Sequence, residues 1–206
     1  MTNPLFYAKI LLFGEYGIIE DSQGLTLPYS FYKGALKFSS LQSDFEKESN
    51  ESLKKYANYL KDLELPDAYT INISALQKDI RKGLFFDSNI PQGYGVGSSG
   101  ALVAAIFERY SIKTYLPEHI SKDELKDLKK IFGQMESYFH GKSSGINPLI
   151  CYMNLPILIE NKENVNKVSI PQSEEGKGAI FLIDSGITGE TGPMVQIFFE
   201  KMKTEG

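Results

Sequence analysis

Residues 91–101 read Pro-Gln-Gly-Tyr-Gly-Val-Gly-Ser-Ser-Gly-Ala, and they lead directly into the apolar run at 102–107. Alternating glycines let a backbone take positive φ values and approach a ligand closely. The apolar run predicts a helix, whose first turn offers unpaired N–H groups and the positive end of the helix dipole. Ser98 and Ser99 can cap this helix, bind a phosphate oxygen or hold a divalent ion. The stretch therefore predicts a phosphate-binding loop, with a flexible serine-capped turn as the alternative.

Two common phosphate-binding motifs do not fit the sequence. In the dinucleotide-binding pattern Gly-x-Gly-x-x-Gly, Ser98 occupies the last glycine position. The fragment Gly141-Lys142-Ser143 resembles the end of a P-loop, but Glu136 stands where the first glycine is required and a helical pattern precedes the fragment. Neither class is supported.

Three segments, in order along the chain, resemble the GHMP kinases, a superfamily of small-molecule kinases. The glycine-rich stretch resembles their ATP-binding motif, whose usual form ends in Gly-Ser-Ser-Ala, so Gly100 replaces a common alanine. Residues 8–17 (Ala-Lys-Ile-Leu-Leu-Phe-Gly-Glu-Tyr-Gly) resemble the N-terminal segment of mevalonate kinases, with Tyr16 in place of a histidine. Residues 136–147 resemble the segment that supplies a magnesium-binding glutamate and, eleven residues later, a catalytic aspartate. The chain is identified as a member of this superfamily, most similar to the mevalonate kinases.

The resemblance implies an α+β fold, with a GHMP kinase N-terminal domain of the ribosomal protein S5 domain 2 type over residues 1–175. Residues 176–206 are then expected to begin a C-terminal α+β domain. GHMP kinases carry a third glycine-rich motif in that domain, and nothing after Gly186 resembles it. The sequence therefore predicts an incomplete second domain, with a buried strand at 179–183 that lacks partners.

Hydrophobic periodicity and turn signals predict the local structure. Ser121 and Glu124 form a capping-box pattern, and an apolar stripe continues from there towards Glu136. If this helix persists, Glu136 and His140 share a face because they are four residues apart. Strands are expected at 6–13, 34–38, 68–73 and 83–88, helices at 46–63 and 194–203, and loops across 154–178.

The resemblance also implies residue roles in the transfer of the γ-phosphoryl group of ATP to a hydroxyl. Lys9 would lower the pKa of the accepting hydroxyl and neutralise charge near the transferred group. Ser99 and Glu136 would complete a Mg²⁺ site, which needs hard oxygen ligands. The expected ATP-binding residues are Pro91, Gly93, Gly95, Gly97, Ser98, Ser99 and Gly100. The expected substrate contacts are Glu15, His140 and Thr191, with a core histidine as the alternative for His140.

Asn147 stands where mevalonate kinases carry the aspartate usually assigned as catalytic base. An amide cannot usefully accept the substrate's proton at neutral pH, so general-base help worth about 10²–10⁴-fold is expected to be missing. The favoured function is an ATP- and Mg²⁺-dependent kinase of a small-molecule hydroxyl, with mevalonate as the favoured acceptor. The alternatives are a phosphomevalonate kinase, a diphosphomevalonate decarboxylase, a catalytically silent nucleotide-binding homologue and an interaction domain that binds no Mg-ATP.

Composition bears on the remaining classes of function. The 206 residues are 42% hydrophobic and carry a net charge of −4 with both signs interleaved, which argues against nucleic-acid and membrane-surface partners. Cys151 is the single cysteine, so an intrachain disulfide is excluded and a buried thiol in a reducing cytosol is expected. No run approaches the ~20 apolar residues that span a bilayer, and no signal peptide is recognisable. We expect a cytoplasmic protein, and the family alone suggests a homodimer.

Overall fold

The computed structural model describes residues 3–169, 182–183, 186, 189 and 191–205. Within these residues an antiparallel sheet contains β1 (Phe6–Phe13), β2 (Gly24–Phe38), β3 (Leu84–Ser88), β4 (Ile157–Ile159) and β5 (Val165–Lys167). The strand order is β1-β2-β4-β5, and β3 pairs with the last part of β2. β2 is the organising strand because it pairs with β1, β3 and β4 along different parts of its length.

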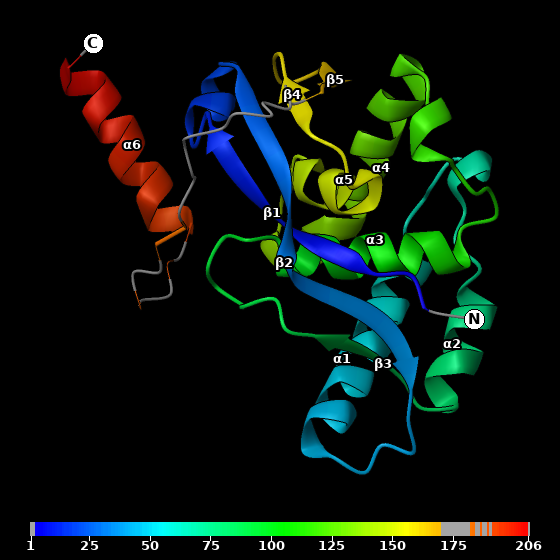
Figure 1. Ribbon diagram of the computed structural model, residues 1–206. Helices are drawn as coiled ribbons and strands as arrows, with labels where there is room; N and C mark the ends of the chain where they lie inside the picture. The colour runs from blue at the N-terminus through cyan, green and yellow to red at the C-terminus, as the bar shows by residue number, and fades with distance from the viewer. Residues whose placement is uncertain (1–2, 170–181, 184–185, 187–188, 190, 206) are drawn as a thin grey trace, which may run out of the picture.

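Helices cover one face of this sheet (Figure 1). They are α1 (Asp44–Lys61), α2 (Ile73–Arg81), α3 (Ser98–Tyr110), α4 (Lys122–His140) and α5 (Ile146–Met153). α3 and α5 pack against β1 and β2, while α4 packs against α3, α5 and β5. The last helix, α6 (Thr191–Glu205), stands apart from the others, beyond β1 and β2. No helix in the described part of the chain combines the length and apolar character needed to cross a membrane.

The hydrophobic core lies between the sheet and the helices, and α3 runs through its centre. Phe107 of α3 contacts Phe132 of α4 edge-to-face with 4.9 Å between ring centroids, and Tyr152 of α5 at 5.5 Å. Such aromatic pairs add about 0.5–1.5 kcal/mol each beyond the area that they bury. The apolar run that follows the glycine-rich stretch is therefore the central helix of the core, which gives the preceding loop a rigid support.

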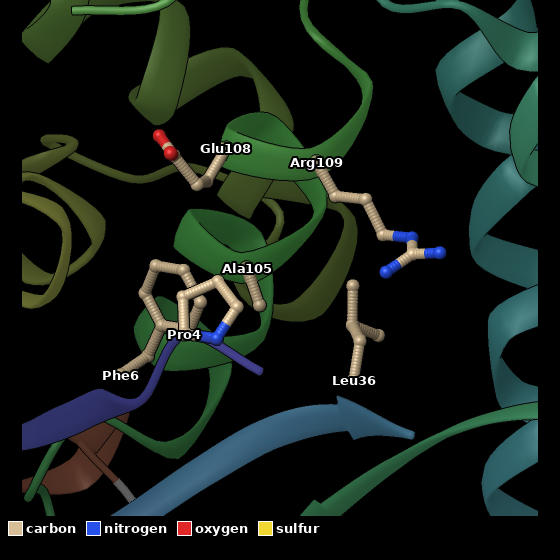
Figure 2. Close-up of a pocket in the computed structure, with 6 residues that line it drawn as sticks. All are labelled: Pro4, Phe6, Leu36, Ala105, Glu108 and Arg109. Carbon is tan, nitrogen blue, oxygen red and sulfur yellow. The ribbon is translucent and has the colours of Figure 1, made fainter. Parts of the chain in front are cut away.

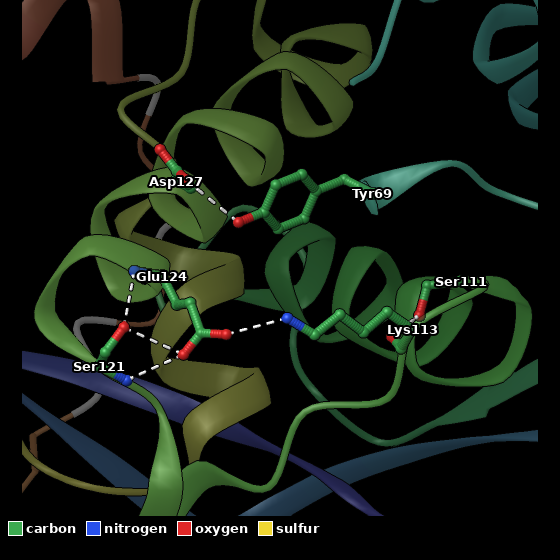
Figure 3. Close-up of polar contacts among 6 residues, drawn as sticks. All are labelled: Tyr69, Ser111, Lys113, Ser121, Glu124 and Asp127. Carbon is green, nitrogen blue, oxygen red and sulfur yellow. Dashed lines mark hydrogen bonds and ion pairs between the residues drawn. The ribbon is translucent and has the colours of Figure 1, made fainter. Parts of the chain in front are cut away.

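Polar contacts fix the start of α4, as Figure 3 shows. Ser121 Oγ accepts from Glu124 N at 3.2 Å and the Glu124 carboxylate accepts from Ser121 N at 3.1 Å, which confirms the predicted capping box. Lys113 Nζ donates to Glu124 Oε1 at 2.9 Å, and this hydrogen bond is the main reason that the pKa of Glu124 is lowered to about 2. Tyr69 OH donates to Asp127 Oδ2 at 3.2 Å. The first turns of α4 are thus held by two separate loops.

Most of the expected elements are present. β1, β3 and α1 confirm the expected elements at 6–13, 83–88 and 46–63, with ends that differ by at most two residues. The strand expected at 34–38 is the last third of β2, which begins earlier, at Gly24.

The strand expected at 68–73 is wrong. The segment contains a 3-10 turn (Asp67–Tyr69), and the nine-residue helix α2 begins at its end. The Asn72 side chain caps α2 by accepting a backbone N–H of the first turn at 3.0 Å. Tyr69 in the 3-10 turn and Ile71 in the connection to α2 are both buried, which produces the strand-like alternation without a strand.

The C-terminal part differs from expectation in three places. β4 and β5 lie within the expected loops at 154–178, because strands of three residues are too short to show a period. The helix α5 was not expected either. Of the buried strand expected at 179–183, only Leu182 and Ile183 are described; they lie in no strand, with 49% and 88% of their surface exposed. The helix expected at 194–203 is confirmed as α6, and the domain boundary at 175 stays a prediction.

The connection between α4 and α5 passes directly against α4. Gly145 has a φ of 77°, and a Cβ there would lie 1.9 Å from the Lys129 carbonyl oxygen and 2.7 Å from Gly133 N. A Cβ on Gly133 would in turn lie 2.9 Å from the Ser143 carbonyl oxygen. These two glycines let the chain turn back onto the helix that it has just left.

We expect Gly145→Ala to lower the free energy of unfolding far more than Gly141→Ala. Both residues have positive φ, 77° and 70°, so each alanine carries about 1–2 kcal/mol of backbone strain. A Cβ on Gly141 meets nothing within 4 Å, whereas at Gly145 the backbone has to move, at a cost of at least a further ~2 kcal/mol. Urea unfolding followed by circular dichroism measures the difference. Equal losses would show that the connection moves away from α4 without cost.

Candidate active site

The glycine-rich loop connects β3 to the first turn of α3. Gly93, Gly95 and Gly97 have φ values of 80°, 69° and 87°, a region that glycine enters at no steric cost. Gly97 occupies the N-cap position of α3 and no side chain caps the helix, so the N–H groups of the first turn are open to a ligand. The Val96 carbonyl oxygen accepts from Lys9 N at 2.9 Å, which ties the loop to β1. This geometry suits the binding of an anion.

The loop, β1 and α5 meet at Gly97. A Cβ there would lie 2.9 Å from Lys9 Cγ and 3.6 Å from Cys151 Sγ. The Cys151 thiol donates a weak hydrogen bond to the Gly97 carbonyl oxygen at 3.8 Å. Burial raises the pKa of Cys151, so the thiol stays protonated at neutral pH, as expected of a core cysteine. Any side chain at position 97 would push the loop away from Lys9.

Gly100 faces α5 from the first turn of α3. A Cβ there would lie 2.7 Å from the Asn147 carbonyl carbon and 2.9 Å from its oxygen. The alanine that is common at this position of the GHMP motif therefore does not fit in this chain. Glycine lets α3 and α5 approach closely, and it places Asn147 beside the start of α3.

The Glu136 carboxylate lies beside Ser99 in the first turn of α3, although Glu136 belongs to the last turns of α4. Glu136 is completely buried. Ser99 Oγ donates to Glu136 Oε1 at 2.9 Å, and Ser143 Oγ donates to Glu136 Oε2 at 2.5 Å. His140 Nε2 lies 3.0 Å from Ser99 Oγ, and because the hydroxyl proton of Ser99 goes to the carboxylate, His140 is the donor. The predicted shared face of Glu136 and His140 is confirmed, since both meet Ser99.

Lys9 brings a positive charge to the same region. Its side chain is 8% exposed, and burial is the main cause that lowers its pKa, while the charges of Glu15 and Glu136 act in the opposite direction. In the part of the chain that the structure describes, the ammonium group has no hydrogen bond or ion pair. A buried cation without such a partner is suited to hold a negatively charged group.

We expect Lys9→Met to stabilise the fold at neutral pH. The change replaces a buried ammonium group with an apolar side chain of similar length, which removes the cost of burying the charge. Because the pKa of Lys9 is lower in the folded state, wild-type stability rises as the pH rises through the folded pKa towards 10.5. The gain from Lys9→Met is therefore largest near pH 7 and shrinks towards pH 10. Thermal unfolding of both proteins across this range measures the gain; a gain that grows with pH would contradict the account.

Asn147 is the second residue of α5 and lies four residues before Cys151. On a helix this spacing puts the two side chains on one face, and on that face the Cys151 thiol meets Gly97, while the backbone of Asn147 meets Gly100. Asn147 is half-buried, and among the described residues no hydrogen bond fixes its side-chain amide. The residue in the expected base position is therefore near the loop and free to meet a ligand.

The other predicted site residues lie on the loop after β1, at the start of α6 and at the two ends of the glycine-rich loop. Glu15 is exposed on the loop after β1, next to Tyr16, which has a φ of 60°. The Tyr16 ring lies 5.9 Å from the Phe198 ring of α6, so this loop contacts the last helix. Thr191 is the first residue of α6, and its side chain lies outside the described part of the structure. Pro91, at the start of the glycine-rich loop, and Ser98, the first residue of α3, are half-buried.

The oxygens of Ser99 and Glu136 are the candidate ligands for a divalent cation. Among the described residues, there is no group of three or more His, Cys, Asp or Glu side chains that could hold a metal by itself. One carboxylate and one hydroxyl suit Mg²⁺, which takes hard oxygen ligands and usually keeps water and phosphate oxygens as its other ligands. The donor set therefore fits a cation that arrives with a phosphate ligand.

Ser143 was not among the predicted site residues, although it contacts Glu136 directly. The only signal is its place in the segment that resembles the mevalonate kinases. Its spacing from Glu136 does not reveal the contact, because the contact depends on the chain turning back at Gly145.

A separate small cavity of about 130 Å³ lies away from this cluster (Figure 2). The Arg109 guanidinium at its edge is already paired with Asp79 at 3.2 Å. The cavity is lined by Phe6 of β1, Leu36 of β2, the α3 residues Ala105, Glu108 and Arg109, and Pro4, which precedes β1. None of the predicted site residues lines this cavity.

Comparison with known proteins gives one family match. The model of the GHMP kinase N-terminal domain family matches residues 53–154, which run from α1 through the glycine-rich loop and Glu136 to the end of α5. No curated protein sequence gives a significant match.

Two solved structures have a similar fold. The L. major mevalonate kinase in complex with R-mevalonate matches with a TM-score of 0.56 and 14% identity, over 98% of this chain and 62% of that one. A second mevalonate kinase matches with a TM-score of 0.50 and 15% identity, over 82% of this chain and 56% of that one. This chain therefore spans about three fifths of the length of these enzymes. From the family match and the shared fold, the chain contains a GHMP kinase N-terminal domain.

Proposed function

We propose that the chain binds Mg-ATP at the glycine-rich loop and transfers the γ-phosphoryl group to the hydroxyl of a small molecule. The observation that carries the proposal is the 2.9 Å hydrogen bond between Ser99, at the open N-terminus of α3, and the completely buried Glu136. A glycine loop, a helix terminus and a pair of hard oxygen ligands are the components that phosphoryl transfer requires at one place. The family match to GHMP kinases supports the same reaction class.

Each residue of the cluster has a role in this proposal. The N–H groups of the loop and of the first turn of α3 would bind the phosphates, and Ser99 and Glu136 would hold the Mg²⁺. Bound Mg²⁺ neutralises charge on the phosphate oxygens. Lys9 would stabilise negative charge near the transferred group and lower the pKa of the accepting hydroxyl. His140, Glu15 and Thr191 are proposed to contact the acceptor.

Mevalonate is the acceptor that we favour. One of the similar structures is a mevalonate kinase in complex with R-mevalonate, and the segments at 8–17 and 136–147 resemble that family. Phosphomevalonate, and the diphosphomevalonate of the related decarboxylases, are the alternative substrates.

Asn147 favours a second candidate function, a nucleotide-binding protein that does not transfer the phosphoryl group. The side-chain amide cannot act as general base, and Glu136, the carboxylate that accepts from Ser99 in the first turn of α3, is proposed to hold the cation instead. In this case the same loop and the same Mg²⁺ ligands would serve binding alone.

Release of ADP at saturating Mg-ATP separates the two candidates. The assay is run with mevalonate, with phosphomevalonate, with diphosphomevalonate and with no acceptor. Release that depends on one of these compounds would support the kinase or its decarboxylating relative, and carbon dioxide release identifies the latter. A protein that binds Mg-ATP but releases ADP at the no-acceptor rate in every case would favour the silent homologue.

A further inference from the structure

Ser143 lies on the connection between α4 and α5, and hydrogen bonds hold it firmly in place. Its backbone N–H donates to Ser137 Oγ at 3.2 Å, and Ser137 Oγ donates to the Gly133 carbonyl oxygen at 2.7 Å. Ser143 Oγ also accepts from Gly145 N at 3.1 Å. The residue is therefore tied to α4 on one side and to the start of α5 on the other. The Ser143 hydroxyl thus accepts from Gly145 N and donates its proton to Glu136 Oε2.

The Glu136 carboxylate depends on two hydroxyl donors. A completely buried carboxylate is stable only when its oxygens are hydrogen-bonded, and here Ser99 serves Oε1 and Ser143 serves Oε2. Ser99 lies on the first turn of α3 and is itself a proposed ligand of the cation. Its hydroxyl would have to turn its lone pair to the cation, whereas Ser143 has no such second task. Ser143 is thus the donor that can keep the carboxylate oriented both before and after the cation binds.

We propose that Ser143 is a positioning residue that orients the Glu136 carboxylate for the divalent cation of the bound nucleotide. This inference rests on the proposed function. Ser143 would act through Glu136, because its hydroxyl donates to that carboxylate. Outer-shell partners of metal ligands typically change metal affinity by about 10–100-fold when they are removed.

The test compares ATP affinity in Mg²⁺ and in EDTA, measured by calorimetry. For Ser143→Ala we expect the affinity in Mg²⁺ to fall about tenfold or more, while the affinity in EDTA stays at the wild-type value. Mn²⁺ used in place of Mg²⁺ gives a second readout, because the electron spin resonance signal of free Mn²⁺ reports how much cation the protein–ATP complex holds. Ser143→Thr keeps the hydroxyl and is expected to restore both readouts.

Ser137→Ala is the matched control. It loosens the same turn by removing the hydrogen bonds to Gly133 and Ser143, but it leaves both donors of the carboxylate in place. Should Ser143→Ala fail to fold, Ser143→Cys offers a side chain of similar size with only a weak donor and is expected to show the same loss.

Two results would overturn the inference: an unchanged Mg²⁺-dependent affinity in the folded Ser143 variant, or an equal loss in Ser137→Ala. If wild-type protein binds ATP no better in Mg²⁺ than in EDTA, the proposed function fails first and this inference fails with it. The wild-type titration therefore distinguishes the two failures.

Discussion

Glu136→Gln is expected to reduce acceptor-dependent ADP release by at least about 10²-fold and to remove the Mg²⁺ dependence of ATP binding. Glutamine has nearly the same shape, so the change removes the negative charge and little else. A preorganised charged ligand in a buried site is worth far more than the same group in water, and removing one such group typically costs about 10²–10³-fold in rate. Coupled ADP assays and calorimetry with Mg²⁺ and EDTA measure both effects.

Glu136→Gln is also expected to keep or raise the free energy of unfolding. A buried carboxylate carries a desolvation cost that a neutral amide does not, and the amide oxygen can still accept from Ser99 or Ser143. A stable protein that has lost Mg²⁺-dependent binding would show that Glu136 is retained for a ligand and not for the fold.

Glu108→Gln provides the matched control. Glu108 is a half-buried carboxylate in α3 at the cavity of Figure 2, and its burial raises its pKa. We expect its replacement to leave ATP binding and ADP release at wild-type values. Mg-ATP binding by Glu136→Gln that equals that of wild type and of Glu108→Gln would contradict the proposed role.

Asn147→Asp is expected to raise mevalonate-dependent ADP release by about 10²-fold or more. The change is nearly isosteric and creates a general base, which is worth about 10²–10⁴-fold. Asn147 lies one turn before Cys151, whose thiol meets Gly97, so the new carboxylate would lie on the face of α5 that is turned towards the glycine-rich loop. Its negative charge would also raise the pKa of Lys9, which burial lowers in the wild type.

Asn154→Asp tests whether the gain is specific to the position. Asn154 is exposed and caps the other end of α5 with a φ of 49°. Its replacement introduces the same charge on the same helix, and we expect no change in rate. If Asn147→Asp binds Mg-ATP but stays as slow as the wild type and Asn154→Asp, the silent nucleotide-binding function is favoured.

Sequence patterns predicted those parts of the molecule whose signals are local. The glycine-rich loop follows from the steric freedom of its glycines, and the start of α4 follows from the capping pattern of Ser121 and Glu124. The shared face of Glu136 and His140 follows from helix geometry alone. These features need no knowledge of which elements pack together.

Features that depend on tertiary contacts could not be predicted. Gly100 looks like a minor departure from a motif until α5 is found within 2.7 Å of its missing Cβ. The contact of Ser143 with Glu136 exists because Gly145 lets the chain turn back onto α4. The start of α2 was missed because the buried residues Tyr69 and Ile71, two positions apart, imitate a strand. β4 and β5 were missed because three residues show no period.

The titration of the wild-type chain with ATP, in Mg²⁺ and in EDTA, tests the central claim most directly. If the glycine-rich loop, Ser99 and Glu136 form a Mg-ATP site, ATP binds in Mg²⁺ and at least about tenfold more weakly in EDTA. A folded protein that binds no ATP, or that binds it equally well in both conditions, would contradict the claim.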